Sequence, residues 1–163
     1  MKMSRPKFIV DAMLGSLARK LRIFGFDTSY YKTGEDSDLL RVASEEGRAI
    51  VTSDRALGET AGRRGLLAFV VVGRKDRERI LSLVDQAERF HTPLEGGDPL
   101  CALCNGSLSE AKREDVRGLL PPKLVAKHRI YYICKECGKV YWHGSHWSRL
   151  RKVEALIATS RRV

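Results

Sequence analysis

Two cysteine pairs in the last 63 residues of this 163-residue chain restrict its fold more than any other feature. The two Cys-x2-Cys pairs are Cys101/Cys104 and Cys134/Cys137, and 29 residues separate them. Each pair can present two thiolates from one tight turn, and two such turns complete a tetrahedron of soft sulfur ligands, which suits Zn²⁺. The spacing therefore predicts a structural zinc site.

Gly106 and Gly138 follow the two pairs and allow the backbone to curl toward sulfur. A unit of this size builds little core, so a bound metal would supply folding energy. The alternatives are a redox pair, an iron–sulfur cluster or free thiols. A redox Cys-x2-Cys usually opens a helix in a thioredoxin-like unit, and neither pair here does.

The first 91 residues alternate short apolar runs with helical patterns. This alternation predicts an α/β fold with a mostly parallel sheet flanked by helices. The expected strands are 7–11, 27–31, 48–52 and 66–72, and the expected helices are 12–26, 39–46 and 75–90. The expected inward positions are Leu14, Leu17, Ala18, Leu21 and Phe24 in the first helix and Ile80, Leu81, Val84 and Ala87 in the last.

A change in composition divides the chain. Residues 92–100 contain two prolines and two glycines and are expected to be a linker. We therefore expect a domain over 1–91 and a zinc ribbon with a C-terminal helix over 101–163. Apolar residues recur at helical spacing in the tail, at Leu150, Val153, Leu156 and Ile157.

The chain is strongly basic, with a formal net charge of +10 and a pI near 9.7. A polyanionic partner, with RNA foremost, is the expectation, although a basic soluble protein without one has the same composition. No apolar run reaches the roughly 18 residues of a membrane span, and a cytoplasmic location is expected.

Acidic side chains follow two of the expected strands. Asp11 ends the first strand, Asp54 follows the third, and Asp36 and Asp38 open the helix between them. In a parallel sheet such residues meet at the carboxyl edge, where they can share Mg²⁺ or Mn²⁺. Such an ion would support hydrolysis of a phosphodiester. As alternatives, Asp36 and Asp54 could be helix caps and Asp38 a favourable first-turn charge.

Basic and aromatic side chains are candidates for contacts with RNA. Arg19, Arg22 and Arg55 could bind phosphate, although most such residues are a solvated helix face. The segment YWHGSHW offers stacking or polar groups at Trp142, His143, His146 and Trp147. The plainer interpretation of the two histidines is packing or a surface contact.

Four segments together resemble the Mut-seven C-terminal RNase family. They are FIVDAMLGSLARKLRIFGFDT, EDSDLLRVASEEGRAIVTSDRAL, CALCNG and CKECGKVYWHGSHW, and the likeness covers about residues 7–150. Members join a PIN-like nuclease domain to a zinc ribbon. The resemblance implies a catalytic site that binds Mg²⁺ or Mn²⁺ through Asp11, Asp36 and Asp54, with Asp38 nearby.

One departure from larger PIN domains concerns a further acid on a helical segment. Only 24 residues separate Asp11 from Asp36, so that segment is expected to be absent, with Asp38 or Glu35 as substitutes. The expected function is a metal-dependent ribonuclease whose ribbon aids RNA binding. A non-catalytic RNA- or ribosome-binding protein and a protein-interaction module are the alternatives, and the sequence leaves monomer and homodimer open.

Overall fold

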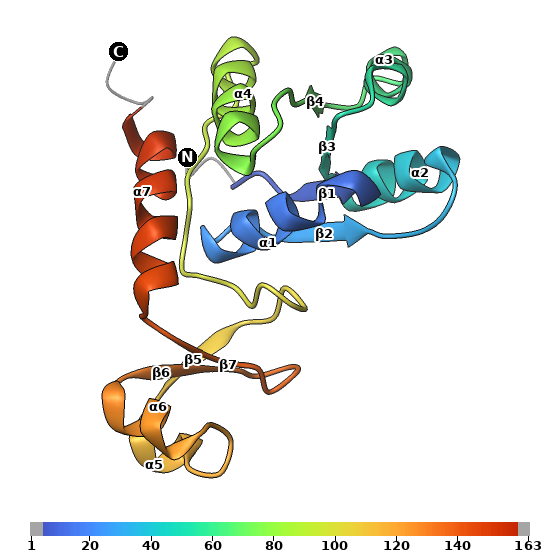
Figure 1. Ribbon diagram of the computed structural model, residues 1–163. Helices are drawn as coiled ribbons and strands as arrows, with labels where there is room; N and C mark the ends of the chain where they lie inside the picture. Colours follow the sequence, from blue (N-terminus) through green and yellow to red (C-terminus); the bar gives the residue numbers. More distant parts are fainter. Residues whose placement is uncertain (1–4, 160–163) are drawn as a thin grey trace.

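A four-stranded parallel sheet forms the centre of the N-terminal part of the molecule (Figure 1). The computed structural model describes residues 5–159. The strands lie in the order β2-β1-β3-β4, and every neighbouring pair is parallel. Their bounds are β1 (Phe8–Asp11), β2 (Thr28–Tyr31), β3 (Ala49–Thr52) and β4 (Ala68–Val70). The predicted α/β fold with a parallel sheet is therefore confirmed.

Helices cover both faces of this sheet because its strands are apolar on both sides. Phe8 and Val10 pack with α1 and α4, whereas Ile9 between them packs with α2 and α3. The helices are α1 (Gly15–Ile23), preceded by the 3-10 turn η1 (Ala12–Leu14), and α2 (Asp36–Glu46), α3 (Arg55–Arg63) and α4 (Asp76–Arg89).

Two details of the helix predictions are corrected. Leu81, expected to point inward, is 39% exposed, and Leu83 takes its place in the core at 1%. The buried positions Ile80, Leu83, Val84 and Ala87 follow the i, i+3, i+4, i+7 rule, which excludes position 81. Helix α3 was not among the predicted helices. It buries only Leu57 and Ala61, so its apolar pattern in the sequence is weak.

The four cysteines belong to a small antiparallel sheet in the order β5-β6-β7. Its strands are β5 (Leu108–Ala111), β6 (Tyr131–Cys134) and β7 (Val140–Trp142), and we call residues 101–142 the ribbon. Two short helices between β5 and β6, α5 (Arg113–Val116) and α6 (Pro122–Lys127), help to close a core around Tyr131. The Tyr131 hydroxyl donates to backbone carbonyls of α6, including that of Leu124 at 2.9 Å.

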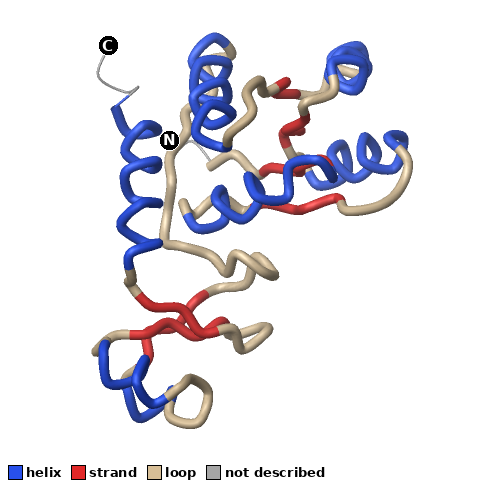
Figure 2. Tube along the Cα trace, viewed as in Figure 1, coloured by secondary structure: helices blue, strands red, loops and turns tan. Residues whose placement is uncertain are grey.

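The last helix, α7 (Ser145–Thr159), returns to the N-terminal part of the molecule. Leu150 and Ile157 are buried in the same core as Phe8 and Phe69, and α7 lies beside α4 (Figures 1 and 2). The predicted tail helix therefore packs against the N-terminal core; residues 160–163 lie outside the described residues. No helix within 5–159 is long and apolar enough to cross a membrane.

The segment expected to be a linker is packed against α1. The Gly97 N–H donates to the Phe24 carbonyl at 3.1 Å, and the Leu100 N–H donates to the Arg22 carbonyl at 2.9 Å. Gly25 has φ +84°, and a Cβ there would lie 2.3 Å from the Gly97 nitrogen, so a side chain would block this crossing. This close contact between residues 97–100 and the end of α1 positions the start of the ribbon.

Candidate functional site

Asp11 and Asp54 lie at the carboxyl ends of two neighbouring parallel strands. Strand β1 pairs with β3, and the chain switches direction across the sheet between these two strands. This is where ligands of open α/β sheets bind. The predicted convergence of the two strand ends therefore occurs.

The hydroxyl of Thr52 joins the two acidic residues. It donates to Asp11 Oδ2 at 2.9 Å and accepts from the Asp54 backbone N–H at 3.0 Å. Thr52 is fully buried at the end of β3, so its own position is fixed by the sheet. The side chain thereby sets the spacing between the first acid and the start of α3.

Both carboxylates also accept backbone hydrogen bonds. Asp11 Oδ1 accepts from the Ala12 N–H at 2.6 Å, and Asp54 Oδ1 accepts from Ala56 and Leu57 at 2.8 and 3.2 Å. The capping function considered for Asp54 is thus real. The Asp54 atom Oδ2 has no hydrogen-bond partner within the described chain, which leaves one of its oxygens available to a ligand.

Asp36 and Asp38 lie at the start of α2, which follows β2 on the other side of β1. Both are exposed, and Asp38 lies 3.6 Å from Arg41 Nε. Burial, followed by the charge of Asp38, raises the pKa of Tyr31, the residue paired with Asp11 in the sheet. Asp38 is therefore near the carboxyl edge but shares no short contact with Asp11 among the described residues.

Only the cysteines meet a strict ligand-distance criterion. Within residues 5–159, no three acidic, histidine or cysteine side chains other than the four cysteines have ligand atoms within 4.8 Å of one another. The acidic edge is thus an open arrangement, in which Asp11 and Asp54 are joined through the Thr52 hydroxyl. Its donors are carboxylate oxygens, which fit a hard ion such as Mg²⁺ or Mn²⁺.

The four thiols have the geometry of a metal site. The Sγ atoms of Cys101 and Cys137 are 3.7 Å apart, and those of Cys104 and Cys134 are 3.4 Å apart. A tetrahedral ion with Zn–S bonds of about 2.3 Å places sulfur atoms about 3.8 Å apart. The set therefore fits Zn²⁺ closely.

Glycine shapes both turns of this site. A Cβ at Gly106 would lie 2.9 Å from the Cys134 sulfur, and Gly138 has φ +74°. The predicted curl of the backbone toward sulfur is confirmed at both positions.

The electrostatics of the thiols favour a divalent ion. Burial would raise the pKa of Cys101, but hydrogen bonds from the Tyr141 hydroxyl and backbone N–H groups lower it to about 7. The Gly106 N–H lowers the pKa of Cys104, but burial and the neighbouring thiols outweigh it and raise that pKa to about 12. Four thiolates cannot be charged together without a cation between them.

Arg22, expected as a phosphate ligand, instead joins the two parts of the molecule. It is 8% exposed, and its guanidinium donates to the Thr28, Ala102 and Leu103 carbonyls at 2.9 to 3.1 Å. Two of these carbonyls lie inside the first cysteine turn. We therefore leave Arg22 out of the RNA surface proposed below, whereas Arg19 and Arg55 are exposed.

Asn105 makes the matching contact from the ribbon. Its Oδ1 accepts from the Thr28 N–H at 3.0 Å, and its Nδ2 donates to Asp27 Oδ1 at 2.9 Å. The residue has φ +69°, a conformation that asparagine tolerates. Asp27 in turn is paired with Arg48 at 2.8 Å, so the first cysteine turn is bonded to the outer strand β2.

The aromatic residues of the YWHGSHW segment form a column. The His143 ring stacks on Trp147 at 4.3 Å and 13° and on Tyr132 at 5.2 Å and 29°. Arg151 lies 5.3 Å from the centre of a Trp147 ring. Trp142 lies beside the ribbon core, and His146 is exposed without a ring contact in the described chain. His143 therefore packs between two rings, which fits the plainer interpretation, while it remains exposed to solvent.

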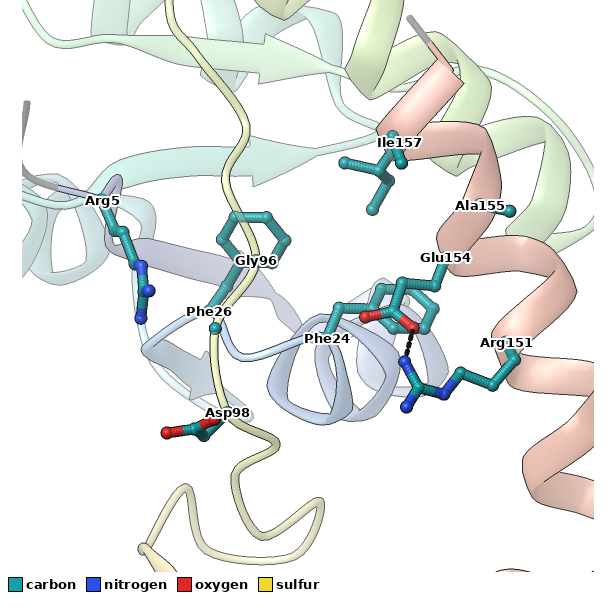
Figure 3. Close-up of a pocket in the computed structure, with 11 residues that line it drawn as sticks. Arg5, Phe24, Phe26, Gly96, Asp98, Arg151, Glu154, Ala155 and Ile157 are labelled. Atoms are coloured by element: carbon teal, nitrogen blue, oxygen red, sulfur yellow. Dashed lines mark hydrogen bonds and ion pairs between the residues drawn. The ribbon is translucent and has the colours of Figure 1, made fainter. Parts of the chain in front are cut away.

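Two cavities of the described chain lie away from the acids. One, of about 480 Å³, lies between the Gly96–Gly97 segment and α7, and Figure 3 shows its rim of Arg5, Asp98 and the Arg151–Glu154 pair. The other, of about 430 Å³, lies near Lys7 and Gly47, at the opposite edge of the sheet. Neither cavity is lined by Asp11 or Asp54, and an open edge suits a long substrate.

Sequence reasoning missed Thr52 and Asn105. Both carry weak signals: Thr52 precedes Asp54 in a TSD triplet, and Asn105 follows a Cys-x2-Cys pair. A hydroxyl at a strand end and an asparagine after a cysteine turn are common, so only their partners in space reveal what they do.

The fold and site define an α/β protein with acids at the switch point of a parallel sheet and a four-cysteine ribbon bonded to its outer strand. The chain belongs to the Mut7-C RNAse domain family, because the sequence model of that family matches residues 6–154. This confirms the resemblance and indicates a nuclease or other RNA-related function. No curated protein and no solved structure matches the chain.

Proposed function

We propose that this protein is a ribonuclease that depends on Mg²⁺ or Mn²⁺, with a structural zinc ion held by the four cysteines. The observation that supports it most is the Asp11–Thr52–Asp54 connection at the switch point of the sheet. Asp11 and Asp54 would hold the catalytic ion, with Asp36 or Asp38 approaching from α2. The bound ion would generate hydroxide and polarise the scissile phosphate.

The protein's own residues then bind and orient RNA. Arg55 follows Asp54 and is exposed, so it can contact a phosphate next to the acids. Arg19 is exposed on α1, which begins four residues after Asp11. At the end of the ribbon and the start of α7, the exposed edge of the aromatic column and Arg151 would extend this surface, with His146 and Trp142 as further candidates.

The test uses substitutions that preserve shape. In Asp11→Asn and Asp54→Asn the amide oxygen still accepts the capping hydrogen bonds, and asparagine is as good a cap as aspartate. We expect each variant to fold and to lose Mn²⁺-dependent cleavage of RNA by about 100-fold or more, because a neutral amide binds the ion weakly. Cleavage of labelled RNA and circular dichroism measure the two properties.

Asp85→Asn is the matched control, since Asp85 is an exposed acid on α4 that pairs with Arg89. Full cleavage by Asp11→Asn would end the nuclease proposal. The open spacing of the acids favours one second candidate, a protein that binds RNA without cleaving it. Salt-sensitive binding with no cleavage in Mg²⁺ or Mn²⁺ would identify that function.

A further inference from the structure

The segment between β4 and α4 carries exposed basic side chains. We call residues 72–77, which include the first two residues of α4, the β4–α4 loop (between the labels β4 and α4 in Figure 1). Arg74, Lys75 and Arg77 are exposed, and none of their side chains has an ion pair or hydrogen bond within the described chain. Three positive charges in four residues are therefore available to an anionic partner.

This loop leaves the sheet at the same edge as the acids. Val70 pairs with Thr52, and the Val71 N–H donates to the Thr52 carbonyl at 2.8 Å. Val72 and Asp54 each come two residues after that pair. The loop therefore begins beside the residue whose hydroxyl contacts Asp11.

The C-terminal end of the loop is bonded to α1. Asp76 accepts from Ser16 Oγ at 2.5 Å and from Lys20 Nζ at 2.6 Å, and its side chain is only 12% exposed. Arg79 donates to the same carboxylate at 3.2 Å. Ser16 lies in the first turn of α1, five residues after Asp11, so this network holds the loop next to the acidic edge.

Backbone hydrogen bonds also fix the loop from within. Glu78 Oε2 accepts from the Arg74 and Lys75 N–H groups at 2.7 and 3.3 Å. Gly73 has φ +128°, and a Cβ there would lie 2.5 Å from the Glu78 Cβ. The cations thus project from a rigid turn, which lowers the entropy cost of binding a ligand.

Two exposed apolar side chains border the same edge. Met13, two residues after Asp11, is 79% exposed, and Val72 is 60% exposed. Such surfaces can contact unpaired bases or ribose, which a duplex keeps inside its stack. Cations for phosphate beside apolar surface for bases suit a single strand.

We propose that the β4–α4 loop is a phosphate clamp that holds single-stranded RNA alongside the Asp11–Asp54 edge. The identity of the ligand rests on the proposed function. The clamp itself is a binding property, and it is measured without cleavage.

The test compares two triple variants of the full-length, zinc-loaded protein. R74A/K75A/R77A removes three charges from the loop. The control R63A/R64A/R89A removes three exposed charges where α3 and α4 end, at the opposite edge of the sheet. Binding of a labelled single-stranded RNA is followed by fluorescence anisotropy over a range of salt concentrations, without added Mg²⁺ or Mn²⁺.

We expect the loop variant to bind at least about tenfold more weakly at low salt. Its plot of log K against log salt should be shallower by about 2, because each lost phosphate contact on a single strand removes about 0.7. The control should keep the wild-type slope, and R74K/R77K, which retains the charges, should bind like wild type. Duplex RNA of the same sequence should bind less tightly than the single strand.

An unchanged slope in the loop variant, an equal loss in the control or a preference for duplex would each overturn the clamp. The nuclease proposal is judged separately. Mn²⁺-dependent cleavage together with an unchanged slope would reject the clamp alone. A shallower salt dependence in the loop variant, in a protein that never cleaves RNA, would reject the nuclease proposal alone.

Discussion

At the scale of single residues, the candidate site depends on one hydroxyl. Thr52 contacts Asp11 Oδ2 and the Asp54 N–H at once, and no water reaches it because it is fully buried. A side chain of the same shape without the hydroxyl would leave both partners without their hydrogen bond. Removing the Thr52 hydroxyl changes no charge, so its effect on the site is one of position alone.

Thr52→Val should therefore lower both activity and stability. We expect Mn²⁺-dependent cleavage to fall by about 10- to 100-fold, as for other residues that orient metal ligands. The free energy of unfolding should fall by about 1–3 kcal/mol, because the half-buried Asp11 carboxylate and the Asp54 N–H lose their partner. Kinetics and urea unfolding measure the two effects.

Thr52→Ser, which keeps the hydroxyl, should retain most of the cleavage activity. Equal losses in the serine and valine variants would show that the methyl group, and hence packing, is what matters at this position.

The Asp76 carboxylate should make the fold sensitive to acid. Burial would raise its pKa, but hydrogen bonds from Lys20 and Ser16 outweigh burial and lower it. Its contribution to stability is therefore complete above the unfolded pKa of about 3.9 and is lost as the pH falls through the folded pKa. Asp76→Asn should flatten the dependence of the unfolding free energy on pH below about 5.

Urea unfolding over a pH series checks this expectation. Asp85→Asn, at an exposed ion pair, should leave the acid dependence close to that of the wild type. A parallel acid dependence in Asp76→Asn and wild type would contradict the assignment.

At the scale of elements, the first cysteine turn is held by strand β2. Asn105 contacts Thr28 and Asp27 through its side chain, and Arg22 contacts the Ala102 and Leu103 carbonyls. These bonds connect a metal-binding turn to the sheet that carries Asp11 on its next strand. The ribbon is therefore not an independent appendage of the fold.

Asn105→Gly should weaken this junction. Glycine keeps the φ of +69° without strain, so the variant removes mainly the two side-chain hydrogen bonds. We expect the free energy of unfolding to fall by about 1–3 kcal/mol in urea. Ser107→Gly adds similar backbone freedom nearby and should cost less; an equal cost would show that the contacts contribute little.

At the scale of the whole molecule, α7 and the first cysteine turn attach the ribbon to the N-terminal sheet at two places. The chain enters the ribbon through the packed Gly97–Leu100 segment and leaves it into a helix whose Ile157 is buried with Phe8. Loss of the ribbon's structure should therefore affect the stability of the sheet. We expect the two parts to unfold cooperatively.

Removal of the metal should reveal this coupling. Both tryptophans, Trp142 and Trp147, lie at the end of the ribbon and the start of α7, so their fluorescence reports on that region. Far-ultraviolet circular dichroism reports mainly on the other helices. After removal of the metal with a strong chelator, we expect both signals to melt together at a lower temperature, because the metal binds only the folded state.

Re-addition of Zn²⁺ should restore both transitions. A fluorescence change with an unaltered circular dichroism transition would mean that the two parts fold independently.

The parallel sheet, the cysteine site and the family could be predicted from the chain alone because their signals are local or repeat at fixed spacing. Apolar runs and helical periods reveal elements, and two Cys-x2-Cys pairs define a ligand set before any folding is known. The pairing of β1 with β3 brought Asp11 and Asp54 to one edge as expected. The position of Leu81 and the extent of α3 were missed because short amphipathic stretches carry little periodic information.

Tertiary structure alone decided that Arg22 is buried under a cysteine turn, that α7 completes the N-terminal core and that Asp76 binds Ser16 and Lys20. These contacts join residues 56 to 149 positions apart, and a basic or apolar side chain looks the same in sequence whether it meets solvent, RNA or another part of the chain. Sequence thus set which chemical groups are present. Only packing determined which of them form contacts within the protein and which stay exposed and able to bind a substrate.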